Sequence, residues 1–136
     1  MREITVKDAI NEALVESFQN DKNVILMGED IAGGKGREEY PGTQDSWGGP
    51  FGVTQGLLTK FGPERVRDTT ITEAGFFGAA VGAAMTGLRP IVELMYVDFL
   101  GVCFDQLMNQ AAKMRYMFGG KQRVPMVVRT VVGAGF

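Results

Sequence analysis

The sequence predicts an α/β fold with a mostly parallel sheet and helices on both faces, and three observations support this. Short apolar runs without polar alternation recur along the chain, as in residues 24–27, which is typical of strands buried on both faces. Segments with helical spacing of apolar residues separate these runs. Glycine and proline punctuate the boundaries, as at Gly62-Pro63. Strands that alternate with helices form βαβ units, so we expect three layers.

The first half of the chain contains two of the predicted helices and one strand. Thr5 followed by Asp8 indicates a helix start, and apolar residues continue with helical spacing to Phe18. The strand at 24–27 follows, and then a polar, glycine-rich stretch at 28–52. Loops of that length inside a domain are usually functional or mobile. Apolar positions between residues 53 and 61 predict a short second helix.

The second half predicts three more strands, at 66–71, 91–97 and 125–130. Between the first two lies a helix of small residues that ends at Gly87, and between the last two lies a helix at 104–115. The length suits one domain. The final segment stops on a glycine-rich loop directly after an apolar run, so we expect the domain to be truncated.

Composition excludes several classes of function. The net charge is −2, and no basic stripe indicates a nucleic-acid partner. The sequence has no histidine, so Ser/His, Cys/His and His-based metal chemistry cannot occur within it. The single cysteine, Cys103, allows no internal disulfide and is expected to be a core thiol. The uncharged stretch at 74–88 is too short for a membrane span, and without an apolar signal region we expect a cytoplasmic protein.

Glu73 is the acid that most needs an explanation, because no other charge lies between Asp68 and Arg89. It stands at the start of the small-residue helix, where the macrodipole and free N–H groups favour a carboxylate. Simple capping is one interpretation. The other is a carboxyl held at the C-terminal end of a parallel strand, where open α/β sheets bind their ligands. The residues alone leave both open.

Two further strand ends carry acids. Glu29 and Asp30 follow the strand at 24–27, and Asp98-Phe99 follows the strand at 91–97. A solvated turn is the alternative to a ligand site at Glu29 and Asp30, and a core ring with a helix cap is the alternative at Asp98-Phe99. The glycines Gly78 and Gly82 indicate close helix packing rather than a dinucleotide loop. The main basic concentration is expected to be a solvated or subunit-facing surface; it comprises Lys113, Arg115, Lys121, Arg123 and Arg129.

A series of short matches runs in order along nearly the whole chain: Gly28-Glu29-Asp30, Gly56-Leu57, Phe61-Gly62, Arg65-Val66-x-Asp68-Thr69, Ile71-x-Glu73, Gly75, Gly87-Leu88-Arg89-Pro90, Glu93, Asp98-Phe99, Asp105-Gln106, Asn109-x-Ala111-Ala112-Lys113 and Arg115-Tyr116. Together they resemble the β-subunit of thiamine-diphosphate-dependent 2-oxo acid dehydrogenases. Other stretches resemble the acetoin dehydrogenase branch: Gln44-Asp45-x-Trp47-Gly48-Gly49, residues 98–106, Tyr116 to Lys121, and Val132-Gly133-Ala134-Gly135.

The resemblance implies that residues 1–136 form a transketolase-like pyrimidine-binding domain. Glu73 matches the glutamate that hydrogen-bonds N1′ of the cofactor aminopyrimidine, which favours the imino tautomer needed to remove the thiazolium C2 proton. Phe99 would stack on the pyrimidine, with Ile71 and Met95 lining the pocket. Glu29 would belong to an acidic proton relay between paired active sites. Met126 matches a position whose carbonyl helps to hold a potassium ion.

The resemblance also implies partners. An α-subunit would hold the diphosphate and its Mg, in an α2β2 heterotetramer that includes a second β-subunit and passes its acyl group to a lipoyl E2 core. Two departures stand out: Thr70 replaces a common proline, and the family's later catalytic histidine is missing. Pyruvate and branched-chain 2-oxo acids are alternative substrates, and a non-catalytic assembly module is the alternative of another class.

Overall fold

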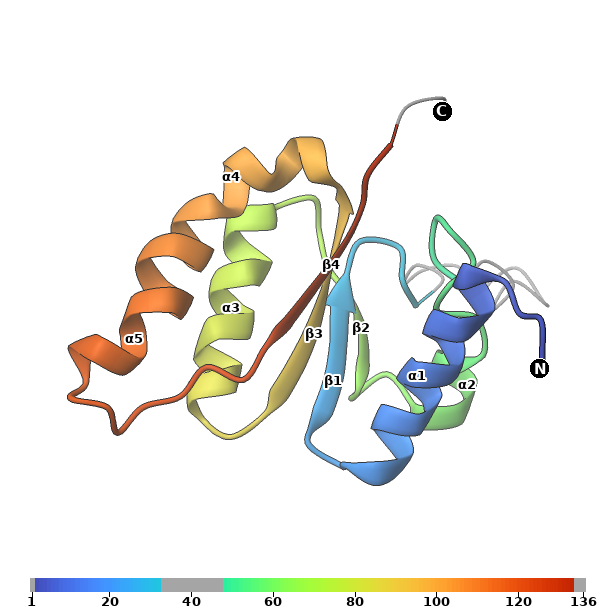
Figure 1. The fold of residues 1–136 in the computed structure, drawn as a ribbon, viewed down its shortest axis with the longest axis horizontal. Coiled ribbons are helices and arrows are strands. Elements are labelled where there is room, and N and C mark those ends of the chain that lie inside the picture. Colours follow the sequence, from blue (N-terminus) through green and yellow to red (C-terminus); the bar gives the residue numbers. More distant parts are fainter. Residues whose placement is uncertain (1, 33–47, 134–136) are drawn as a thin grey trace.

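The computed structural model describes residues 2–32 and 48–133. Most of the expected glycine-rich loop and the acetoin-like stretch from Gln44 to Trp47 therefore lie outside the described residues, as do Ala134 and Gly135. The described part holds one parallel sheet with the strand order β2-β1-β3-β4. Helices α1 and α2 lie on one side of the sheet, and α3, α4 and α5 lie on the other (Figure 1). The predicted fold class is confirmed.

The central strand β1 (Val24–Gly28) is buried along its whole length, as its unbroken apolar run predicted. Val24 and Leu26 pack into the core beneath α1, while Ile25 and Met27 pack into the core beneath α3. Its neighbours are β2 (Val66–Asp68) and β3 (Arg89–Tyr96). Strand β4 (Val127–Val131) lies at the edge beside β3.

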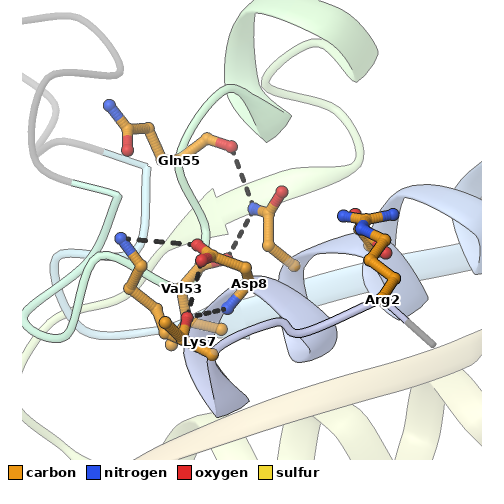
Figure 2. A network of polar contacts seen from close by, with 8 residues as sticks. Arg2, Lys7, Asp8, Val53 and Gln55 are labelled. Atoms are coloured by element: carbon orange, nitrogen blue, oxygen red, sulfur yellow. Dashed lines mark hydrogen bonds and ion pairs between the residues drawn. The ribbon is translucent and has the colours of Figure 1, made fainter.

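Helix α1 (Val6–Asn20) begins where the sequence predicted, because the hydroxyl of Thr5 accepts a hydrogen bond from Asp8 N at 3.1 Å. Helix α2 (Leu57–Phe61) is shorter than the predicted helix, since Val53 and Thr54 belong to a preceding turn. Figure 2 shows how this turn is tied to α1: Asn11 Nδ2 donates to Val53 O at 2.7 Å and to Gln55 O at 3.0 Å.

Strand β2 corrects the sequence prediction, which continued it to Ile71. Its last bond to β1 is Thr69 N to Gly28 O at 2.9 Å, and β1 ends at Gly28. With no neighbour left to pair with, residues 70–72 leave the sheet, and Ile71 is 84 % exposed. Helix α3 (Glu73–Met85) follows at once, and Gly87 after it adopts φ +108°.

The last long helix has three parts: α4 (Leu100–Asp105), the π-helical turn η2 (Gln106–Ala111) and α5 (Ala112–Met117). The short 3-10 turn η1 (Val97–Phe99) joins it to β3. A Cβ on Gly78 of α3 would stand 3.1 Å from Gln106 Oε1. The small residue therefore lets η2 lie close to α3, which fits the packing interpretation of the glycines. Cys103 is fully buried between these layers, as predicted.

Candidate functional site

The strand order places a topological switch point between β1 and β3. The chain leaves β1 toward α2 on one face of the sheet and leaves β3 toward α4 on the opposite face (Figure 1). Where neighbouring strands send their connections to opposite faces, the carboxyl ends of the strands form a ligand-binding crevice. The residues that follow β1 and β3 are therefore the first candidates for a site.

Two buried carboxyl groups lie at this edge of the sheet. Glu29 directly follows β1, and Glu73 is the first residue of α3; each is 9 % exposed. Burial raises the pKa of Glu29, and the charges of Glu73 and Asp30 raise it further. The charge of Glu73 also adds to the rise that burial causes in the pKa of the Cys103 thiol. Glu73 thus lies between the end of β1 and the start of α4.

These carboxyls are not neutralised by a cation in the described part of the chain. No lysine or arginine there forms an ion pair with Glu29 or Glu73. Glu29 Oε1 also has no hydrogen-bond partner among the described residues. A buried carboxyl without a partner is costly, so this arrangement is expected where a bound group completes the site.

Three apolar residues lie at the same edge of the sheet, and two of them, Ile71 and Phe99, are exposed. Phe99, the last residue of η1, is 39 % exposed, and its ring meets the Tyr96 ring edge-on with centroids 6.0 Å apart. Ile71 projects from the segment just before Glu73. Met95 is half-buried in β3, where the register with β4 shifts between Leu94 and Tyr96. All three follow or end strands at this edge of the sheet, and their role as pocket residues stays a prediction.

Two predicted positions do not join this group. Asp98 is exposed in η1, and no described contact connects it with the buried pair. Met126 lies just before β4, so in a parallel sheet it stands at the opposite edge from Glu29 and Glu73. It is half-buried and packs on the core beneath α3. In the described ranges, no cluster of acidic or cysteine side chains could hold a metal ion.

Sequence reasoning missed an ion pair between the neighbouring strands β3 and β4. Glu93 in β3 is 2 % exposed and accepts a hydrogen bond from Arg129 in β4, which was expected on the surface. Glu93 pairs in register with Gly28 on its other side. A Cβ at residue 28 would come within 2.9 Å of Glu93 Cβ, so only glycine leaves room for the pair beneath the site. The sequence signal for this pair was Glu93 itself, a single acid within an apolar strand.

The geometry suits a flat heterocycle with a ring nitrogen. A buried carboxyl at a helix start can form a hydrogen bond with that nitrogen. An exposed aromatic ring beside it can stack on the heterocycle. The orphaned oxygen of Glu29 adds a second polar group at the same edge. The residues present therefore fit an aminopyrimidine.

Residues 2–136 match the family "Transketolase, pyrimidine binding domain". The chain belongs to this family.

Its relatives include subunits of multi-component oxidoreductases. It is 57 % identical over 135 residues to the acetoin:2,6-dichlorophenolindophenol oxidoreductase subunit beta of Bacillus subtilis. It is 55 % identical over 135 residues to the protein of the same name from Cupriavidus necator. Identity to the pyruvate dehydrogenase E1 component subunit beta of Rickettsia felis is 48 % over 132 residues.

These alignments cover 97–99 % of the chain but only 36–39 % of the relatives. The chain thus spans well under half the length of each relative. No helix in the described ranges is long and apolar enough to cross a membrane.

Proposed function

We propose that this chain is the pyrimidine-binding part of the β-subunit of a thiamine-diphosphate-dependent E1 component, with Glu73 as the acid that activates the aminopyrimidine. The observation that carries the proposal is the buried carboxyl pair, Glu29 and Glu73, at the switch point of the sheet beside the exposed Phe99. When bound, thiamine diphosphate supplies a thiazolium carbon that can be deprotonated and can store electrons.

The chain's own residues have separate tasks in this proposal. Glu73, the first residue of α3, forms a hydrogen bond with the ring nitrogen. Phe99 orients the ring by stacking, and Ile71 and Met95 exclude water from its edges. Glu29 holds a second proton behind Glu73, as expected of a relay member, because its raised pKa favours the protonated form.

Acetoin is the proposed substrate, since the two acetoin-named relatives share more identity with the chain than the pyruvate dehydrogenase subunit does. The relatives are named as beta subunits, which supports an α-subunit partner. We propose that this partner binds the diphosphate and Mg. An α2β2 assembly, the lipoyl E2 core, the potassium position at Met126 and a cytoplasmic location remain predictions. Pyruvate and branched-chain 2-oxo acids are the alternative substrates.

The test uses the full-length β-subunit assembled with its α-subunit. We expect Glu73→Gln to slow hydrogen–deuterium exchange at the cofactor C2 by at least about 100-fold, in line with loss of a positioned proton-transfer group. Glu64→Gln is a matched control, because Glu64 is an exposed carboxyl just before β2. Near wild-type exchange in Glu73→Gln would support the assembly-module alternative. Dye reduction with acetoin, pyruvate and branched 2-oxo acids then identifies the substrate.

A further inference from the structure

The turn that carries Glu29 contains an unfavourable backbone conformation. Asp30 has φ +56°, the one positive φ at a non-glycine residue in the described ranges. Left-handed backbone at such a residue costs about 1 kcal/mol or more and persists only where the surroundings determine it. The position of the Glu29 carboxyl therefore depends on the contacts that hold residues 29–32.

Thr54 holds this turn from the α1 side of the sheet. Its hydroxyl donates to Ile31 O at 2.7 Å, and its backbone N–H donates to Gly48 O at 2.7 Å. The residue is 2 % exposed. A Cβ on Gly49 would stand 3.0 Å from Thr54 Oγ1, so the packing around the hydroxyl is tight. Thr54 joins the Glu29 turn to the turn before α2.

The opposite side of the Glu29 turn is held by residues at the end of β2. Asp68 Oδ1 accepts a hydrogen bond from Ala32 N at 2.6 Å, and Thr69 N donates to Gly28 O at 2.9 Å. These contacts fix the two ends of the turn, at residues 28 and 32. The carbonyl of Ile31, between them, depends on Thr54.

Thr54 is itself anchored to α1. The side chain of Asn11 donates to the carbonyls of Val53 and Gln55, the two neighbours of Thr54 (Figure 2). Asn11 lies on α1, whose core residues Leu14 and Phe18 pack under the sheet. A continuous set of contacts thus runs from a well-packed helix through Thr54 to the Glu29 turn.

We propose that Thr54, held by Asn11, is a positioning residue that keeps the Glu29 carboxyl beside Glu73. The importance given to Glu29 rests on the proposed function. The contacts that hold its turn do not depend on that proposal. The Thr54 hydroxyl bonds to the carbonyl of Ile31 and acts on the Glu29 carboxyl through the backbone of the turn. Without the hydroxyl, that buried carbonyl loses its donor, and the strained turn rotates to find another.

The test is a substitution series in the full-length β-subunit assembled with its α-subunit. Thr54→Val keeps the shape and removes the hydroxyl, whereas Thr54→Ser keeps the hydroxyl. If Thr54→Val fails to fold, Asn11→Ala serves in its place, because it removes the side chain that anchors the neighbours of Thr54 to α1. Thr59→Val is the matched control, because Thr59 is an exposed threonine on α2.

The main readout is the titration of Glu29 in the cofactor-free assembly, followed by isotope-edited infrared difference spectroscopy with Glu29→Gln as the reference. Burial and the charge of Glu73 raise the pKa of Glu29, so displacement should lower its midpoint, by about half a pH unit or more in Thr54→Val. Asn11→Ala should move it less in the same direction. Thr54→Ser and Thr59→Val should keep the wild-type midpoint.

A folded Thr54→Val assembly with the wild-type Glu29 midpoint would overturn the inference, as would a folded Thr54→Ser assembly that shifts as far as the valine variant. If Thr54→Val does not fold, an unchanged midpoint in Asn11→Ala overturns it. Binding of the free aminopyrimidine alcohol, measured by calorimetry on the wild type, is a separate arm. Failure to bind would count against the proposed function and leave the titration result standing.

Discussion

Arg65 connects three parts of the chain, and its replacement gives the most direct test of the packing beneath the sheet. Its Nε donates to Val24 O at 2.9 Å, and its Nη2 donates to Phe18 O at 3.0 Å and Asp21 O at 2.7 Å. The guanidinium carbon lies 4.5 Å from the centre of the Phe18 ring. One side chain therefore closes the end of α1 and aligns the start of β1.

The expected cost follows from these contacts. Hydrogen bonds from a charged donor contribute roughly 1.5–3 kcal/mol each, but bonds that share one group are not additive. The stacking adds about 0.5–1 kcal/mol. Since Arg65 is only partly buried and water can reach some of the released carbonyls, we expect Arg65→Met to lower the free energy of unfolding by about 3 kcal/mol. Arg65→Lys should retain less than half of the stability lost in Arg65→Met, because the lysine ammonium lacks the planar set of N–H donors of a guanidinium.

Urea unfolding followed by circular dichroism measures this effect. With a slope of about 1.5 kcal/mol per molar urea, the midpoint of Arg65→Met should fall by about 2 M. Arg67→Met is the matched control, because Arg67 is exposed and its side chain bonds to the neighbouring Glu64 rather than across the fold. Its change should stay within about 0.5 kcal/mol. Equal losses in the two methionine variants would refute the assignment of Arg65 as the connecting residue.

Two further predictions concern the acids of the site. Arg129→Met should destabilise the protein by about 3–5 kcal/mol, because it leaves the buried Glu93 carboxylate without its partner. The double variant Glu93→Met/Arg129→Met should regain most of that stability. If the urea midpoint of the double variant falls by the sum of the two single changes, the prediction is contradicted. Glu29→Gln should stabilise the protein at pH 7–8. The folded-state pKa of Glu29 lies above its ordinary value of 4.5, so ionisation costs the wild type stability as the pH rises through the range between the unfolded-state and folded-state pKa values. The gain should vanish well below pH 4.5, where the carboxyl is protonated in both states. An equal gain there and at pH 7–8 in thermal unfolding would disprove the linkage.

The sequence predicted the parts of the fold that depend on local pattern. The buried strand β1, the Thr5 cap of α1 and the start of α3 at Glu73 could all be predicted from apolar runs and capping residues. The end of β2 could not, because Thr70 and Ile71 favour a strand but the partner strand has already ended at Gly28. Strand length there is decided by a neighbour about forty residues away in the chain.

In the candidate site too, features that follow from local pattern could be predicted, and features that depend on contacts between distant segments could not. Glu73, Glu29 and Phe99 could be placed at one edge because each follows a strand of a parallel sheet. The pairing of Glu93 with Arg129 depends on the register of β3 and β4, which residue spacing does not reveal. The hydroxyl of Thr54 meets Ile31 across a separation of 23 residues, and nothing in either sequence neighbourhood indicates it.

The strand order also determines when the sheet can form. Strand β1 is made first but pairs with β2 and with β3, whose residues begin at 66 and 89. Its apolar run stays without either neighbour until those segments have left the ribosome, and non-local parallel pairing is slow to form. Strand β1 therefore waits longer for a neighbour during synthesis than any other described strand. Changes that delay β3 should lower the soluble yield before they change the stability of the folded protein.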